Sequence, residues 1–180
     1  MFATMPQRRA RLARLHRQRG ASLLEAIAYL GVAAIVVLAA VSLLQNAFGS
    51  ARSNQTMEEI TGLRTAVHKM YAGQSYNDAT MVANLVAAKA IPGTLTLGAN
   101  NAITNAWGGT VTVAKVDAAN FRITYENVPQ EVCMNVVSGA SGWTRIADGD
   151  DGNAITVFPV TAASAAALCK ASTTIAFTSN

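Results

Sequence analysis

A long apolar run near the start of the chain limits what the rest can fold into. Residues 21–44 carry one charged side chain, Glu25, and the next charge downstream is Arg52. About 20 apolar residues in a helix, rising about 1.5 Å each, cross the roughly 30 Å hydrocarbon core of a bilayer. A carboxylate at the centre of such a helix costs about 2.5–3.5 kcal/mol, so one within a span usually has a partner or a function. The run therefore predicts a fully covered helix with one functional acid near its start.

The basic residues are distributed unevenly along the chain. It contains 14 lysines and arginines against 10 aspartates and glutamates. Six arginines precede Gly20 in a segment without acids, namely Arg8, Arg9, Arg11, Arg14, Arg17 and Arg19. Positive charge beside an apolar span stays on the cytoplasmic side, so the remainder of the chain is expected to be exported. Because that remainder is slightly acidic, the high isoelectric point does not predict nucleic-acid binding as the main function.

The basic leader, the glycine and the acid together resemble the processing site of type IV prepilins. In that family a short basic leader ends in Gly, and Glu stands at the fifth mature position; here these are Gly20, Ala21 and Glu25. The resemblance implies that a prepilin peptidase cleaves between Gly20 and Ala21 and methylates the new N-terminus. It also implies that Glu25 pairs with the terminal amine of an adjacent subunit. The alternatives are a plain single-span anchor and a cleaved secretory signal, although residues 45–50 fit a signal cleavage site poorly.

Residues 21–72 predict one long helix. Its first half is apolar on every side and is expected to protrude from the folded domain. Beyond Asn46, apolar residues recur at steps of three and four positions. They are Met57, Ile60, Leu63, Val67 and Met70, while Arg52, Glu58, Glu59, Arg64 and Lys69 are expected on the other faces. A sheet is expected to cover this apolar stripe.

The chain beyond residue 72 alternates short helices and strands. Asn77 or Asp78 is expected to cap a helix over residues 79–89, and Pro129 and Thr161 to open two more. Two-residue alternation and turn residues predict strands over residues 110–116, 121–125, 143–147, 154–158 and 173–177. The predicted fold class is α+β, with a long N-terminal helix and a four- to five-stranded antiparallel sheet packed on its second half.

Two later segments resemble the thin-pilus subfamily of type IVb pilins, the PilS-like major pilins. They are residues 105–113, Asn-Ala-Trp-Gly-Gly-Thr-Val-Thr-Val, and residues 127–133, Asn-Val-Pro-Gln-Glu-Val-Cys. The resemblance covers nearly the whole chain and implies the pilin fold. It implies residues 1–20 as the removed leader, 21–49 as a transmembrane and filament-core helix, and 50–180 as the exported globular domain.

The chain has two cysteines, Cys133 and Cys169, both in the part expected to be exported. In an oxidising compartment an even pair is expected to form a disulfide, the alternative being two buried thiols. Under the resemblance, residues 133–169 are the disulfide-bounded D-region of the family. Neither cysteine has a neighbouring histidine or a Cys-x-x-Cys partner, so no redox or metal site is expected.

Residues that could carry chemistry are sparse. Asp148, Asp150 and Asp151 form an acidic cluster, but Gly152 stands where a calcium loop needs an oxygen ligand, so a hairpin turn is expected instead. His68 is the one histidine after the leader and is expected to be structural. No cofactor and no enzymatic activity are expected, because the mature chain offers no nucleophile–base pair and no ligand cluster.

These features favour a structural subunit of a type IVb pilus that serves adhesion or conjugative cell–cell contact. The alternatives are a minor pilin, a pseudopilin of type II secretion and a single-span membrane-anchored periplasmic protein. The implied partners are further copies of the chain in a helical homopolymer, a prepilin peptidase, an assembly ATPase with its inner-membrane platform, and a tip adhesin. Before assembly the chain would span the inner membrane once with its C-terminal domain in the periplasm. After assembly it would form an extracellular pilus on a Gram-negative bacterium.

Overall fold

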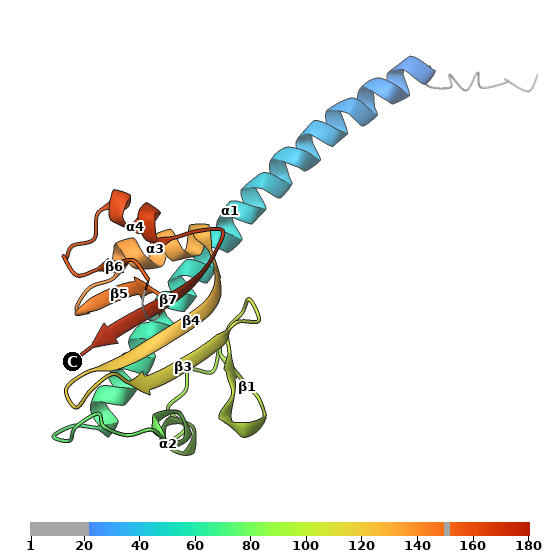
Figure 1. Cartoon of the computed structure of the whole chain (residues 1–180). Coiled ribbons are helices and arrows are strands. Elements are labelled where there is room, and N and C mark those ends of the chain that lie inside the picture. The colour runs from blue at the N-terminus through green and yellow to red at the C-terminus, as the bar shows by residue number, and fades with distance from the viewer. Residues whose placement is uncertain (1–21, 150–151) are drawn as a thin grey trace, which may run out of the picture. The chain divides into compact units, whose positions relative to one another are not determined.

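The computed structural model of the chain describes residues 22–149 and 152–180, apart from the side chains of Gln45 and Asn46. The chain divides into two compact units, Met1–Ser42 and Leu43–Asn180, and each is described by itself. The described residues of the first unit lie almost entirely in helix α1, which has the bounds Leu23–Met70. All other elements belong to the second unit (Figure 1).

The elements that follow α1 alternate short helices and strands. First come α2 (Met81–Ala87), β1 (Thr96–Leu97), the 3₁₀ helix η1 (Ala99–Asn101), β2 (Ile103–Thr104), β3 (Thr110–Lys115) and β4 (Phe121–Pro129). They are followed by α3 (Gln130–Gly139), β5 (Arg145–Asp148), β6 (Ala154–Ile155), α4 (Ala162–Leu168) and β7 (Ser172–Ser179). The strands form one antiparallel sheet in the order β1-β2-β3-β4-β7-β5-β6.

The predicted α+β class is confirmed, with a larger sheet than the sequence indicated. The sheet has seven strands where four or five were predicted. A strand lies at each of the five predicted places, and the additional strands are β1 and β2, which have two residues each. Two residues are too few to show the alternation by which a strand is recognised in a sequence. These two strands widen the sheet at one edge and leave the predicted strands side by side.

The core of the second unit lies between α1 and one face of the sheet, with α1 running behind the strands in Figure 1. Ile60, Leu63 and Val67 of the predicted stripe are buried, while Met57 and Met70 are partly buried against them. The opposing side chains lie in register across five strands: Val113, Ile123, Phe177, Ile146 and Ile155. Burial of one such side chain stabilises the fold by about 1.5–3 kcal/mol. The apolar stripe of α1 and the apolar face of the sheet therefore pack together in a single core.

A disulfide joins α3 to the residue that follows α4. Cys133 and Cys169 are bonded to each other, with their Cα atoms 5.7 Å apart, and both residues are buried. Helix α4 begins where the Thr161 hydroxyl oxygen accepts a hydrogen bond of 3.2 Å from the Ser164 amide. In Figure 1, α3 and α4 lie against each other at one side of the sheet. The predicted bridge is therefore present, and it ties two short helices together.

Candidate functional site

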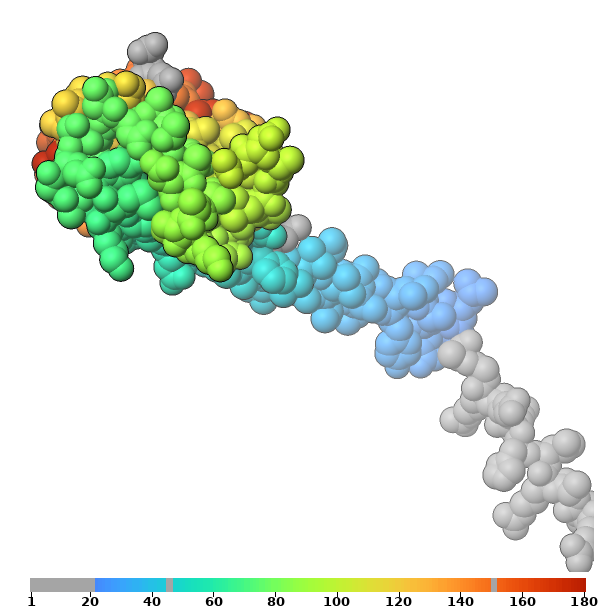
Figure 2. Space-filling model, turned by 90° about the horizontal axis from the view of Figure 1, so that it is seen from below, coloured from blue at the N-terminus to red at the C-terminus, as the bar shows by residue number. Residues whose placement is uncertain are grey.

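The apolar part of α1 exposes its large side chains around the whole helix (blue in Figure 2). Between Leu23 and Leu44, their exposed fractions range from 45% at Val41 to 81% at Leu23. By length and composition α1 could cross a membrane, a test that core helices and N-terminal signal sequences also pass. A soluble monomer rarely exposes a contiguous apolar patch of more than a few hundred Å². This surface therefore needs lipid or another protein to cover it.

Glu25 lies in the first turn of this helix, where the local sequence favours an acid. The Ser22 hydroxyl oxygen accepts a hydrogen bond of 3.2 Å from the Glu25 amide, and the Ser22 carbonyl accepts one of 3.0 Å from Ala26. Ser22 and Glu25 have the spacing of a capping box, and a carboxylate at this end is stabilised by the helix dipole. The Glu25 carboxylate forms no ion pair with any residue that the structure describes. Its charge is therefore available to a partner.

The residues predicted for processing and metal binding are described only in part. Gly20, Ala21, Asp150 and Asp151 lie outside the described residues. Asp148 ends β5 and accepts a charged hydrogen bond of 3.1 Å from Lys170. Within residues 22–149 and 152–180, no group of three or more potential metal ligands occurs. Asp148 thus has a cationic partner of its own in Lys170.

His68 lies between the end of α1 and the sheet. Its Nδ1 is 3.0 Å from the Tyr76 hydroxyl and its Nε2 is 3.4 Å from the Ser179 hydroxyl. The ring also meets the Phe121 ring edge-on, with centroids 5.3 Å apart. Burial, and then the positive charge of Arg64, lower the pKa of His68 below its ordinary value of 6.5. The structure thus joins His68 to three separate segments of the chain, in keeping with a structural function.

We expect the lowered pKa of His68 to make the fold less stable in mild acid. The unfolded chain takes up a proton near pH 6.5, whereas the folded chain resists it. The stabilisation is therefore complete above about pH 6.5 and declines as the pH falls toward the folded pKa. Thermal unfolding of the full chain in detergent, between about pH 7.5 and 5, should show this decline. His68→Gln should flatten it, and a wild-type curve without slope in this range would contradict the expectation.

A tight turn before β3 fits into an irregularity of β4. The Asn105 side-chain oxygen accepts hydrogen bonds from the amides of Trp107 (3.0 Å) and Gly109 (2.9 Å), and its side-chain nitrogen donates to the Glu126 carbonyl (2.7 Å). A Cβ atom at Gly109 would collide with that same carbonyl. The β4–β7 register shifts just after Tyr125. The first segment that resembles PilS-like pilins, residues 105–113, therefore contacts β4 at Glu126, directly before the second such segment, residues 127–133.

Gly109→Ala is expected to destabilise the domain. The added methyl group must displace the β4 backbone rather than a mobile side chain, and such overpacking costs about 1–3 kcal/mol or more. Urea unfolding of the full chain in detergent should show a lower midpoint. The matched control is Gly93→Ala, because a Cβ atom at Gly93 meets no atom within 4 Å. Equal midpoints for the two variants would show that the close approach at Gly109 is not a constraint.

The structure corrects one expectation about the charged residues of α1. Glu59 is 3% exposed, whereas the sequence placed it away from the core face. The Glu59 carboxylate accepts a hydrogen bond of 2.9 Å from the side-chain amide of Gln55. The pKa of the buried Tyr125 is raised first by burial and then by the charge of Glu59. Glu59 lies four residues before Leu63 and eight before Val67, so helical geometry could have placed Glu59 on the buried face. The buried face of α1 is therefore partly polar.

Arg64, which was expected on a face away from the core, also contacts other parts of the domain. Its guanidinium lies over the Trp143 ring, 4.8 Å from the centroid, and donates a hydrogen bond of 3.0 Å to the Ser179 hydroxyl. Both partners lie more than 75 residues away in the chain. No local pattern identifies such a contact, because it depends on the tertiary fold. Arg64 thus holds the end of β7 and the segment before β5 to α1.

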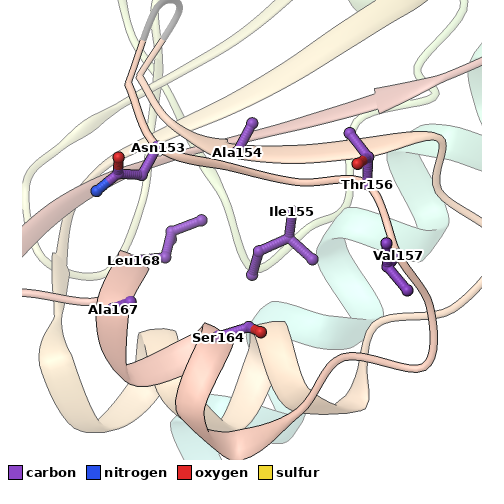
Figure 3. Close-up of a pocket in the computed structure, with 8 residues that line it drawn as sticks. All are labelled: Asn153, Ala154, Ile155, Thr156, Val157, Ser164, Ala167 and Leu168. Carbon is purple, nitrogen blue, oxygen red and sulfur yellow. The ribbon is translucent and has the colours of Figure 1, made fainter.

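A groove of about 430 Å³ separates β6 from α4 (Figure 3). Ile155 and Leu168 point into it, and Val157 at its rim is 78% exposed. The polar side chains in the lining are those of Asn153, Thr156 and Ser164. The described residues of the lining include no acid, base or thiol, so they offer a surface for packing rather than groups for acid–base chemistry.

Comparison with known proteins gives matches over most of the chain. A family model described as PilS N terminal matches residues 50–180. The chain is 28% identical, over 175 residues, to the major structural subunit of bundle-forming pilus of Escherichia coli O127:H6, covering 85% of this chain and 88% of that relative. A relative of the same description from Escherichia coli O111:H- is 28% identical over 127 residues, or 67% of this chain and 64% of the relative.

Proposed function

Because this chain belongs to the PilS family of type IVb pilins, we propose that it is the main structural subunit of a type IVb pilus, assembled through the apolar part of α1. The observation that carries the proposal is the exposed apolar helix, whose first turn holds an acid without an ion-pair partner among the described residues, in a chain whose residues 50–180 match the family model. Both relatives are described as major structural subunits, which supports a major rather than a minor subunit.

The proposal assigns a function to each part of the chain. Residues 1–20 are a leader that a prepilin peptidase removes after Gly20, leaving Ala21 as a methylated N-terminus. Residues 21–49 span the inner membrane before assembly and form the core of the filament afterwards. Residues 50–180 are the exported domain, with residues 133–169 as its D-region. An assembly ATPase and its membrane platform move the chain from the bilayer into the filament.

Assembly exchanges one apolar environment for another. In the membrane, lipid covers the helix, and in the filament other copies of the same helix cover it. Since lipid chains are as apolar as leucine, excluding water contributes little to this exchange, and packing and polar pairing must favour the filament. The Glu25 carboxylate supplies such pairing by binding the terminal amine of an adjacent copy. A charge without a partner in this low-dielectric core would be costly, so the pair also fixes the register between copies.

The filament serves contact between cells, through adhesion or conjugation. Support comes from the relatives, whose name describes a pilus that forms bundles. The described surface of the second unit offers a groove without catalytic groups, which suits contact with another macromolecule better than chemistry. A separate tip adhesin completes the proposed assembly on the surface of a Gram-negative cell.

Electron microscopy of cells tests this proposal. The full chain would be expressed with a type IVb assembly system in bacteria that lack their own pilins, and filaments would be labelled with antibody against residues 50–180. The proposal expects label along the whole length of each filament, and no filaments when the peptidase is omitted. Label only at filament ends would indicate a minor pilin. Antigen confined to membranes despite a functional assembly system would indicate an anchored protein, and both results would contradict the proposal.

A further inference from the structure

Tyr29 is a second polar side chain on the apolar part of α1, close to Glu25. It follows Glu25 by four residues, so the two lie one turn apart on the same face, with Cβ atoms about 5–6 Å from each other. Tyr29 is 67% exposed, and its neighbours in the helix are aliphatic. An otherwise aliphatic surface therefore carries an acid and a hydroxyl side by side.

The Tyr29 hydroxyl has no hydrogen-bond partner among the described residues. The backbone carbonyls of the surrounding turns are already bonded within α1, so the helix backbone offers no free acceptor. At a membrane surface, water and lipid headgroups satisfy a tyrosine hydroxyl. In a dry contact between helices it must find a side-chain acceptor, because an unpaired buried hydroxyl is unfavourable.

The Glu25 carboxylate is the acceptor that helical geometry places nearest. Tyrosine side chains on a helix lean toward the N-terminus, so we expect the Tyr29 ring to cover the turn that carries Glu25. No hydrogen bond joins the two side chains within one copy. A carboxylate can accept about four hydrogen bonds, so one amine does not fill it. A second copy packed against this face could therefore use the remaining acceptor positions.

We propose that in the assembled filament the Tyr29 hydroxyl donates a hydrogen bond to the Glu25 carboxylate of a second copy of this chain. The inference rests on the proposed function and adds a second residue, beside Glu25, that fixes the register between neighbouring copies. A slip of one helical turn between neighbouring copies would leave both the hydroxyl and the carboxylate without this bond. Tyr29 thus makes the preferred register more specific than a single charge pair can.

Solid-state NMR of filaments tests the contact directly. Copies with ¹³C-labelled tyrosine and copies with ¹³C-labelled glutamate would be mixed before assembly, so that only contacts between copies give a Tyr–Glu signal. The proposal expects a signal between a tyrosine Cζ and a glutamate Cδ that disappears in Tyr29→Phe filaments. If the wild-type signal is absent, or is unchanged by Tyr29→Phe, the proposed bond does not exist.

The stability of purified filaments gives a second test. Tyr29→Phe removes the hydroxyl and keeps the ring, and its filaments should release subunits in mild detergent about tenfold faster than wild type, since hydrogen bonds to charged groups are the stronger ones. Ser42→Ala is the matched control, because it removes a hydroxyl from the same helix at a distance from Glu25. Equal release from Tyr29→Phe and wild-type filaments would overturn the proposal about Tyr29 while leaving the pilin function intact. Failure of the wild-type chain to form filaments would overturn the pilin function itself.

Discussion

Glu25→Gln is expected to abolish surface filaments while the chain still enters the membrane and is cleaved. Glutamine keeps the size of the side chain and its hydrogen-bonding capacity but removes the charge. Removing one partner of a buried ion pair costs about 3–5 kcal/mol, because the other charge is left unpaired. The same cost would recur at every subunit of a filament, so the effect on assembly should be close to complete. Filaments sheared from the surface and quantified by immunoblot, against the membrane fraction of the same cells, measure it.

A comparison of two substitutions separates the charge of Glu25 from its position at the start of α1. The Glu25 amide donates to the Ser22 hydroxyl in the first turn, and in a capping box the acid side chain can in turn accept from the Ser22 amide. Glu25→Ala removes both the charge and this capping capacity. Glu25→Gln removes the charge alone. Pairing between copies predicts that both variants fail to assemble. Normal filaments from Glu25→Gln, with failure of Glu25→Ala alone, would show that the residue acts by capping its own helix.

Removal of the Cys133–Cys169 disulfide is expected to produce the largest loss of stability in the second unit. The bond closes a segment with a sequence separation of 36 residues, and both sulfur-bearing residues are buried. Loss of a native disulfide from a small exported domain costs about 2–5 kcal/mol. The Cys133→Ala, Cys169→Ala double variant should therefore unfold at a much lower urea concentration than the wild type, with the full chain in detergent.

Reduction provides the control for this experiment. A reducing agent should lower the unfolding midpoint of the wild-type chain toward that of the double variant and leave the variant unchanged. The bond also holds α3 and α4 together, so limited proteolysis of the variant should begin within residues 133–169. Similar midpoints for the oxidised wild type and the double variant would contradict the assigned stabilisation.

The helix and the central strands could be predicted because their residues repeat with the period of the structure. Ile60, Leu63 and Val67 reveal the buried face of α1 by helical spacing, and Val111 and Val113 reveal one face of β3 by alternation. The cysteine pair could be predicted from the expected compartment. The helical spacing and the strand alternation can each be recognised within a few neighbouring residues, and the disulfide can be predicted because the chain has only two cysteines.

Features that depend on distant contacts could not be predicted in this way. Strand β2 exists through pairing with β3, and β1 through pairing with β2, rather than through any pattern of their own. The requirement for glycine at position 109 comes from the Glu126 carbonyl, and the contact of Arg64 with Trp143 depends on the fold of the whole domain. The partner proposed for Glu25 belongs to another copy, so a single chain does not contain it.

The intact mass of the subunit recovered from sheared surface filaments is the sharpest test of whether this chain is processed and assembled as a pilin. Cells would express the full chain together with a prepilin peptidase and an assembly system. We expect a chain that begins at Ala21, carries one methyl group on its terminal amine and lacks the two thiol hydrogens of Cys133 and Cys169. A chain that keeps its first twenty residues and stays in the membrane fraction, or one that begins after the apolar run, would contradict it.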